Sequence, residues 1–251
     1  MIDLRGKRAL VTGGGRGIGA ATALLLAEAG ADVAIGYRSR APEAEAVAAQ
    51  CRALGVRALA HPADLGTAAG AASLAARAAK EFGGLELFVG NAGIWPVEEA
   101  TAAAMDDARW TRTMRENVDG MFFSTREALR MMSDGGRVVL VSSTAGQRGE
   151  SMHADYAASK GAMISFVKSI AIELAPRRIT VNSVAPGWVD TEMSAESFAD
   201  GGRARVAATI PIGRVATARD IAGPIVFLCS ELARHITGEI LNVNGGSVLC
   251  G

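Results

Sequence analysis

The chain has 251 residues, with 26 Lys+Arg balanced by 26 Asp+Glu. A chain of this length can bury one large core, and its 49% hydrophobic content excludes intrinsic disorder. The charge balance argues against nucleic acid or an anionic membrane as the main partner, because both attract proteins with a basic excess.

Signals for export or membrane insertion are not expected in this chain. Residues 1–7 are too short and too mixed in character for a signal peptide, and no apolar run reaches the ~18 residues of a membrane span. Cys51, Cys229 and Cys250 lie far apart and have neither disulfide-framework nor metal-site spacing. These features predict a cytoplasmic protein whose cysteines serve mainly as small buried side chains.

Short apolar strands alternate with helices along the whole chain. The expected strands cover residues 8–12, 32–37, 56–61, 85–90, 136–142, 179–184 and 239–243. The expected helices cover residues 18–29, 42–54, 68–82, 100–114, 115–132, 155–174 and 221–228. Non-alternating apolar strands are buried on both faces, so the pattern predicts a doubly wound, Rossmann-type parallel sheet of about seven strands. We expect a single α/β domain over residues 1–251, with a substrate lid at about 188–216.

A glycine-rich turn follows the first expected strand and opens the first helix. It reads Thr12-Gly-Gly-Gly-Arg-Gly-Ile-Gly19. Such a turn lets the backbone approach a pyrophosphate, which then meets the free N–H groups and positive dipole end of the helix. The chain has no P-loop pattern and no ligand cluster of metal-site spacing, so neither a nucleotide triphosphatase nor a catalytic metal is expected.

A second group of polar residues is expected at the carboxyl edge of the sheet. Tyr156 and Lys160 are four residues apart in one expected helix, so their side chains share a face. Ser143 ends the fifth expected strand, Asn91 follows the fourth, and Asn117 lies in the helix between them. Because ligands of parallel sheets bind at the carboxyl ends of the strands, these groups are expected to converge on one crevice.

Together these motifs resemble the short-chain dehydrogenase/reductase family, and in particular its 3-oxoacyl-carrier-protein reductase-like members. The resemblance covers essentially the whole chain. The matching positions are Thr12 to Gly19, Asp64, Asn91-Ala-Gly93, Asn117, Ser143, Tyr156 with Lys160, and Pro186-Gly187. It implies an NAD(P)-dependent oxidoreductase that acts on a small carbonyl or alcohol substrate and assembles as a homotetramer.

The resemblance also implies the catalytic residues: Asn117, Ser143, Tyr156 and Lys160. Tyr156 would exchange a proton with the substrate oxygen, and the nearby Lys160 charge would lower its pKa. Ser143 would orient that oxygen and stabilise the charge that develops on it. Lys160 would also bind the nicotinamide ribose, Asn117 would hold a water in a proton relay, and Asp64 would accept a hydrogen bond from the adenine amino group.

The implied cofactor-binding residues come from the glycine turn and from the ends of several strands. They are Gly13, Arg16, Gly17, Ile18, Gly19, Arg38, Ser39, Asp64, Leu65, Asn91, Ala92, Gly93, Tyr156, Lys160, Pro186, Gly187, Val189 and Thr191. NADP is expected over NAD, because Arg38 follows the second strand where a ribose 2′-phosphate would project. Asp32 has the spacing of an NAD-type ribose ligand but opens that strand, so it is interpreted as a turn residue.

The sequence is less informative about the substrate. In the family, the segments that line the substrate mouth correspond here to Ile94, Trp95, Gln147, Arg148, Met152, His153, Trp188 and Met193. His153 is interpreted as a polar residue of the rim. Residues 133–136 lack the basic side chains that would meet an acidic carrier protein, although Arg177 and Arg178 keep a basic spot elsewhere.

Three hypotheses therefore remain open. The first is an NADP-dependent carbonyl reductase or alcohol dehydrogenase, with a 3-oxoacyl thioester as one candidate substrate. The second is an NAD-dependent dehydrogenase of a sugar or secondary alcohol. The third is a regulatory protein that binds the cofactor without turnover, which the intact Ser143, Tyr156 and Lys160 set disfavours.

Overall fold

The computed structural model describes residues 2–249, so Cys250 and the last residues of the apolar segment 243–251 lie outside the described part. Its centre is a parallel sheet of seven strands in the order β3-β2-β1-β4-β5-β6-β9. The strands are β1 (Arg8–Thr12), β2 (Asp32–Tyr37), β3 (Ala58–Pro62), β4 (Leu85–Gly90), β5 (Met132–Val141), β6 (Thr180–Pro186) and β9 (Ile240–Val243). The predicted doubly wound sheet is confirmed.

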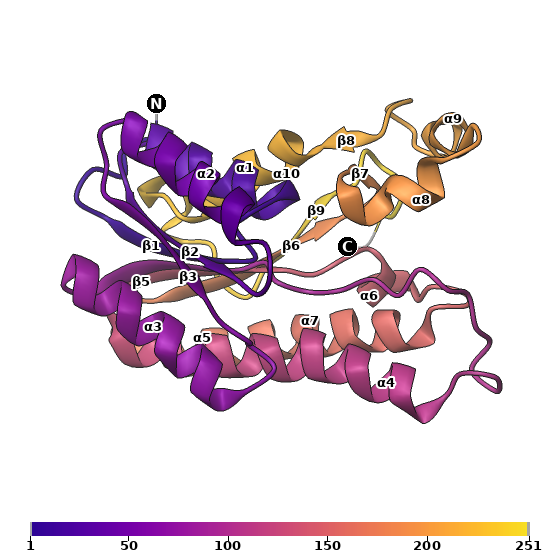
Figure 1. Ribbon diagram of the computed structural model, residues 1–251, viewed down its shortest axis with the longest axis horizontal. Helices are drawn as coiled ribbons and strands as arrows, with labels where there is room; N and C mark the ends of the chain where they lie inside the picture. Colours follow the sequence, from indigo (N-terminus) through magenta and orange to yellow (C-terminus); the bar gives the residue numbers. More distant parts are fainter. Residues whose placement is uncertain (1, 250–251) are drawn as a thin grey trace.

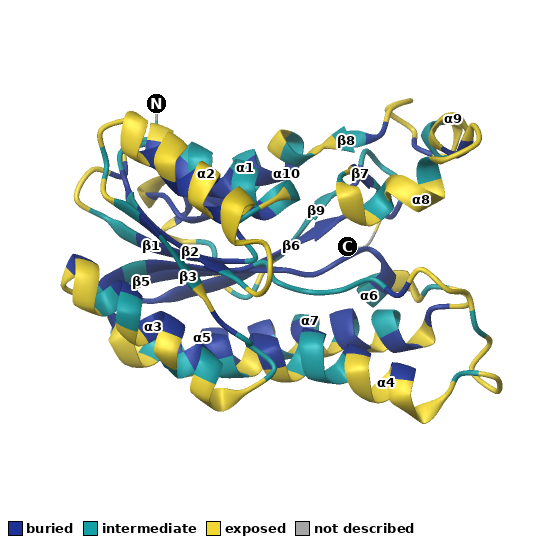
Figure 2. Ribbon diagram, in the orientation of Figure 1, coloured by how far each residue is buried: buried dark blue, intermediate teal, exposed yellow. Residues whose placement is uncertain are grey.

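Helices cover both faces of this sheet (Figure 1). One face carries α1 (Gly17–Glu28), α2 (Ala41–Ala53) and α10 (Ala218–Leu228). The other carries α3 (Ala68–Phe82), α5 (Gly120–Met131) and α7 (Ala154–Leu174), with α4 (Asp107–Met114) packed against α7. Figure 2 shows the burial concentrated in the strands and on the sheet-facing sides of the helices. The two faces have separate apolar clusters, one around Leu26 and Ile225 and the other around Leu74 and Met163.

The strand order reverses between β1 and β4, and the two strand ends are tied together there. The Thr12 hydroxyl oxygen accepts hydrogen bonds from the backbone N–H groups of Asn91, at 2.9 Å, and Ala92, at 3.0 Å. The crevice outside such a reversal is where open α/β sheets bind their ligands. The topology therefore places the glycine turn and the Asn91 segment side by side at one binding crevice.

Two predicted boundaries are wrong, and each error has a local cause. Residues 100–106 are not helical, because the Asp106 side chain caps α4 by accepting from the backbone N–H of Arg109, so the helix begins at Asp107. Strand β5 begins at Met132, which pairs with Leu85 ahead of a register shift. A π-helical turn at Arg115–Asp119 joins α4 to α5, and the other boundaries differ by three residues or fewer.

The segment 188–216 stands at one end of the sheet, beyond the carboxyl ends of the strands (Figure 1). It contains β7 (Val189–Asp190), the turn η3 (Glu192–Ser194), α8 (Ala195–Phe198) and α9 (Gly202–Ala208). Strand β8 (Ala216–Thr217) begins at its last residue and pairs with β7. The remaining short elements are α6 (Ala145–Arg148), η2 (Ala175–Arg177) and η4 (Glu231–Ala233). That the segment acts as a lid, and that the chain is one functional domain, stay predictions.

Cys51 and Cys229 are buried, as the sequence predicts for two of the three cysteines. Burial raises the pKa of the Cys51 thiol to about 11 and that of the Cys229 thiol to about 12. Both thiols are therefore protonated at neutral pH and are poor nucleophiles. Within residues 2–249, no helix combines the length and the apolar character that crossing a membrane requires.

Candidate active site

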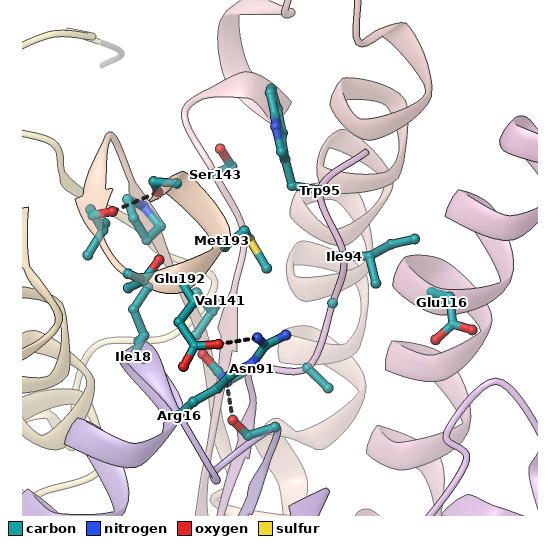
Figure 3. Close-up of a pocket in the computed structure, with 18 of the residues that line it drawn as sticks. Arg16, Ile18, Asn91, Ile94, Trp95, Glu116, Val141, Ser143, Glu192 and Met193 are labelled. Carbon is teal, nitrogen blue, oxygen red and sulfur yellow. Dashed lines mark hydrogen bonds and ion pairs between the residues drawn. The ribbon is translucent and has the colours of Figure 1, made fainter. Parts of the chain in front are cut away.

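A cavity runs along the carboxyl edge of the sheet, from the glycine turn to the segment 188–216 (Figure 3). Most of the predicted site residues line it: Gly13, Arg16, Gly17, Ile18, Arg38, Ser39, Leu65, Asn91, Ala92, Gly93, Ser143, Tyr156, Lys160, Pro186, Gly187, Val189 and Thr191. Three others, Gly19, Asp64 and Asn117, do not line it. The structure therefore brings residues that are far apart in the sequence into one continuous site.

The glycine turn is shaped for a close backbone approach. Helix α1 begins at Gly17, and its N-cap Arg16 makes no side-chain cap, so the first N–H groups are not satisfied by a side chain. Gly13 has a φ of 64°, which favours glycine, and a Cβ at Gly19 would collide with the main-chain oxygen of Gly13. The open helix end, without acidic residues in its first turn, fits the pyrophosphate of a dinucleotide.

The proposed catalytic side chains meet where β5 and α7 come together. Lys160 Nζ donates a hydrogen bond to the carbonyl oxygen of Val141 at 2.9 Å and lies 5.7 Å from the centre of the Tyr156 ring. Ser143 Oγ accepts from the backbone N–H of Ala145 at 3.1 Å, which leaves its hydroxyl hydrogen to be donated. These side chains line the same cavity and can address one substrate oxygen.

Burial sets the protonation of this group. It raises the pKa of Tyr156 to about 12, against the opposing effect of a hydrogen bond with Ser143 and with a further rise from the charge of Glu150. It also lowers the pKa of Lys160 to about 8. The pKa of Tyr156 is therefore raised overall and not lowered as predicted, because burial outweighs the stabilisation of the phenolate by the nearby Lys160. Tyr156 is therefore a protonated phenol at neutral pH, which is the form of a general acid.

Asn117 lies in the π-helical turn, a feature that often marks functional sites. Its side-chain oxygen accepts from the backbone N–H of Ile94 at 2.8 Å. Its amide nitrogen donates to the carbonyl oxygen of Ile94 and to Ser159 Oγ, both at 3.0 Å. Asn117 thus braces the loop after β4 against α7, and its part in a proton relay stays a prediction.

A buried ion pair holds the start of α7 next to Tyr156. Asp155 is fully buried, and Arg109 from α4 contacts it with Nε and Nη2, each at 3.1 Å. Arg109 also donates to the carbonyl oxygens of Glu98 and Met152. Burial alone would raise the pKa of Asp155, but hydrogen bonds from Arg109 and Thr113 outweigh burial and keep the pKa below its usual value.

We expect Arg109→Met to lower the free energy of unfolding by about 3–5 kcal/mol, because it leaves the Asp155 carboxylate buried without its counter-charge. Urea unfolding followed by circular dichroism measures the loss. Arg77→Ala is the matched control, since Arg77 pairs with Glu81 in an exposed i,i+4 bridge and should cost below about 1 kcal/mol. If the two substitutions lower the free energy of unfolding equally, the Arg109–Asp155 ion pair does not stabilise this part of the fold.

Three arginines surround the other end of the cavity. Arg16 and Arg40 both pair with Glu192, at 2.7 and 3.1 Å, and Arg38 pairs with Glu116 at 2.5 Å. Figure 3 shows the contact between Arg16 and Glu192. The guanidinium groups are about half exposed, so an anion can compete with these carboxylates for them.

Two acidic residues that are candidate cofactor ligands in the sequence are paired with arginines. Asp64 accepts from Arg115 at 2.5 Å and from the backbone N–H of Gly66 at 3.1 Å, so its predicted contact with adenine stays a proposal. Asp32 pairs with Arg57 at 2.6 Å where β2 begins and does not line the cavity. The structure thus places Asp32 at the amino end of the strand, as the sequence indicates.

The substrate end of the cavity is largely aromatic and apolar. Of the residues predicted for the mouth, Ile94, Trp95, Arg148, Trp188 and Met193 line it, whereas Gln147, Met152 and His153 do not. The interpretation of His153 as a rim residue is wrong, because it is 6% exposed and stacks on the indole of Trp95. Gln147 donates to Asn242 at 2.7 Å, and Met152 takes a left-handed φ of 66° just before α7.

Two glutamates at the cofactor end, Glu116 and Glu192, are not among the residues predicted for the site. Glu116 sits in the π turn next to Asn117, and Glu192 lies 176 residues after its partner Arg16. Arg40, two residues after Arg38, is a third cation at this end that the sequence does not assign to the site. The sequence signal for Glu116 is its position beside Asn117, and no local pattern points to Glu192.

Comparisons with known proteins agree with this geometry. The family model described as "Enoyl-(Acyl carrier protein) reductase" matches residues 13–247. The chain is 41% identical over 256 residues to versicolorin reductase 1 of Aspergillus parasiticus, covering 97% of each protein. It is 38% identical over 247 residues to the 3-oxoacyl-(acyl-carrier-protein) reductase FabG of Escherichia coli, covering 98% of each.

A solved short-chain dehydrogenase from Burkholderia cenocepacia, in complex with NADP, superposes with a TM-score of 0.90 at 38% identity. The match covers 97% of this chain and 98% of that one. The chain therefore belongs to the short-chain dehydrogenase/reductase family and is an oxidoreductase of that family. This result also removes the hypothesis of a regulatory protein without activity.

Proposed function

We propose that the protein is an NADP-dependent carbonyl reductase. The observation that carries the proposal is a single cavity with Ser143, Tyr156 and Lys160 at one end and three arginines at the other. Tyr156 keeps its proton at neutral pH, so it can serve as the proton donor that reduction needs at the substrate oxygen. The named reductases among the relatives support the same direction.

The cofactor, when bound, supplies the hydride that adds to the carbonyl carbon. The chain's own residues handle the oxygen. Ser143 donates a hydrogen bond to the carbonyl oxygen and stabilises its growing negative charge. Tyr156 gives that oxygen its proton, which yields the alcohol and a phenolate, and the charge of Lys160 stabilises the phenolate. Lys160 uses one of its three N–H groups on Val141, so the others remain for ribose hydroxyls.

The second candidate is an NAD-dependent dehydrogenase of a sugar or secondary alcohol. Glu116 and Glu192 favour it, because carboxylates at the cofactor end can accept hydrogen bonds from a ribose diol. The reduction of a 3-oxoacyl thioester on a carrier protein has weaker support. Arg177, part of the predicted basic spot, is paired with Asp134 at 3.1 Å and donates to two backbone carbonyls.

A cofactor and substrate panel tests the proposal. Purified protein is mixed with NADPH or NADH and a ketone, a 3-oxoacyl thioester, or, in the reverse direction, a sugar alcohol. Nicotinamide absorbance reports turnover. We expect NADPH-dependent reduction of at least one ketone class. Exclusive NAD-dependent oxidation of sugar alcohols would favour the second candidate, and no turnover with any pair would refute the proposal.

We expect kcat/KM for reduction to be level at neutral pH and to fall as the pH rises through about 8. Lys160 has a pKa of about 8, so it is charged below that pH and neutral above it. Loss of the charge removes the stabilisation of the Tyr156 phenolate, whereas the phenol itself persists because its pKa is about 12. A pH–rate profile measures this. A profile that stays flat well above pH 8 would contradict the role of Lys160.

We also propose the homotetramer that the sequence suggested. Exposed apolar side chains on α5 and α7 support it: Phe122 is 40% exposed and Ile172 is 79% exposed.

We expect light scattering to give four times the chain mass of 25.8 kDa. Ile172→Lys should lower that mass, because a charge would be buried in the subunit contact. Leu54→Lys, at another exposed apolar residue at the end of α2, should not. A monomer mass for the unaltered protein at micromolar concentration would refute the tetramer.

A further inference from the structure

Two indole rings form a corner at the substrate end of the cavity. Trp95 follows β4 and Trp188 precedes β7, and both line the cavity. Their ring centres are 6.4 Å apart and their planes are inclined at 67°. Both side chains are only partly buried, so they are walls of the cavity rather than members of the core.

Trp95 is the fixed wall of this corner. The imidazole of His153 stacks on the indole with 4.0 Å between ring centres and an interplanar angle of 17°. The ring of Tyr156 meets the same indole edge to face, at 4.7 Å and 80°. Buried His153 Nε2 has no hydrogen-bond partner among the described residues, so the imidazole contributes mainly its flat face. The position of Trp95 is thereby tied to the residue proposed to donate the proton.

Trp188 is the second wall and belongs to the lid segment. Its indole packs on Phe198 of α8, with ring centres 5.8 Å apart. Apolar side chains and one ion pair lie beside these two walls. Ile94 and Met193 line the cavity, and the cation at the rim, Arg148, pairs with Glu150 at 3.0 Å. Figure 3 shows Trp95 and Ser143 on the same side of the cavity.

We infer that the substrate is a ketone whose carbonyl is fused to or carried by a flat aromatic ring, and that Trp95 selects it. A flat ring that stacks on one indole meets the other at a steep angle, and both geometries are favoured between aromatic rings. Because Trp95 touches the Tyr156 ring, a substrate ring on this wall lies beside the proton donor. A saturated ring or a flexible acyl chain gains no such contact. The inference rests on the proposed reductase function and adds its substrate class.

Two ketones with the same ten-carbon skeleton test the inference: 1-tetralone, which contains a benzene ring, and 1-decalone, which is saturated. The intrinsic reactivities differ, so the decisive quantity is how a substitution changes the ratio of their kcat/KM values. We expect Trp95→Leu to lower that ratio about tenfold, mainly by weakening the binding of the aromatic ketone and so raising its KM, since an aromatic contact adds a factor of roughly 2–12. Trp95→Phe should retain most of the ratio.

His153 is a positioning residue, because it acts on the substrate only through its stacking against Trp95. A variant that keeps a flat ring at this position distinguishes the loss of this stacking from a general loss of structure. His153→Phe keeps a flat ring against Trp95 and should keep the ratio, whereas His153→Leu should lower it. The affinity for 1-naphthol, measured by calorimetry and compared with that for the saturated alcohol 1-decalol, gives a readout that does not depend on turnover. Melting temperatures identify any variant that fails to fold, and the Phe variants then decide the result.

The outcomes separate this inference from the proposed function. If the unaltered protein reduces 1-decalone or an acetoacetyl thioester, and the Trp95 variants leave the tetralone ratio unchanged, the substrate class is wrong and the reductase function stands. If no ketone or thioester is reduced with either cofactor, the proposed function fails and the inference fails with it. If Trp95→Leu lowers the ratio of the kcat/KM values for 1-tetralone and 1-decalone about tenfold, and Trp95→Phe keeps most of that ratio, both the substrate class and the reductase function are supported.

Discussion

Tyr156→Phe is expected to abolish carbonyl reduction while leaving cofactor binding nearly intact. The substitution removes one oxygen, and with it the proton that the substrate oxygen must receive. Proton transfer by a positioned side chain contributes about 10²–10⁴-fold to a rate, and the lost orientation of the carbonyl adds to that. The phenyl ring keeps the packing against Trp95, so the site should hold its shape. Single-turnover kinetics with NADPH measure the loss.

The matched comparison is Lys160→Ala, which should impair both turnover and cofactor binding. Lys160 stands beside the Tyr156 ring and also has N–H groups free for the ribose. Cofactor affinity, measured by nicotinamide fluorescence, therefore separates the two variants. A Tyr156→Phe enzyme that kept more than half of the original rate would end the proposed mechanism, because the mechanism assigns the proton to the Tyr156 hydroxyl alone.

The convergence of Ser143, Tyr156 and Lys160 was predictable from the sequence because regular structure fixes their positions, whereas their proposed catalytic roles came from the family resemblance. Tyr156 and Lys160 follow from helical spacing, and Ser143 follows from its place at the end of a buried strand. Their protonation was not predictable. The pKa of Tyr156 depends on how deeply the folded chain encloses the phenol, and no local pattern records that enclosure.

At the cofactor end, by contrast, the main ionic contacts could not be predicted from the sequence. The glycine turn indicates a dinucleotide, but the ionic partners of the arginines come from distant segments. Glu192 reaches Arg16 and Arg40 from the turn η3, and Glu116 reaches Arg38 from the π turn. Such contacts depend on tertiary geometry. The aromatic corner is similar, because Trp95 and His153 stack only after α7 packs beside the loop that follows β4.

Those ion pairs bear on the second large expected effect, the reversal of cofactor preference by Arg38→Asp. Arg38 lines the cavity at the end of β2, where the adenosine ribose of a dinucleotide would lie. A guanidinium can bind a 2′-phosphate with two charge-assisted hydrogen bonds, each of which contributes roughly 1.5–3 kcal/mol when it is well formed. Because Arg38 is about half exposed and already pairs with Glu116, the net loss should be about 1.5–3 kcal/mol, which weakens the use of NADPH about tenfold to a hundredfold. The new carboxylate repels the phosphate as well, so preference should move to NADH.

Glu116 makes the prediction sharper. It holds Arg38 at 2.5 Å while Arg38 remains about half exposed, so the phosphate and Glu116 compete for the same guanidinium. Glu116→Gln removes the competitor and should preserve or increase the preference for NADPH, in the direction opposite to Arg38→Asp. Arg77→Asp, on the exposed side of α3, makes the same charge change away from the cavity and should leave the preference for NADPH over NADH unchanged.

The measurement is kcat/KM for NADPH and NADH in all four proteins. If the unaltered protein prefers NADH, or if Arg38→Asp leaves the ratio of kcat/KM for NADPH and NADH unchanged, Arg38 does not bind the 2′-phosphate. Glu116 and Glu192 would then be better explained as partners of a ribose diol.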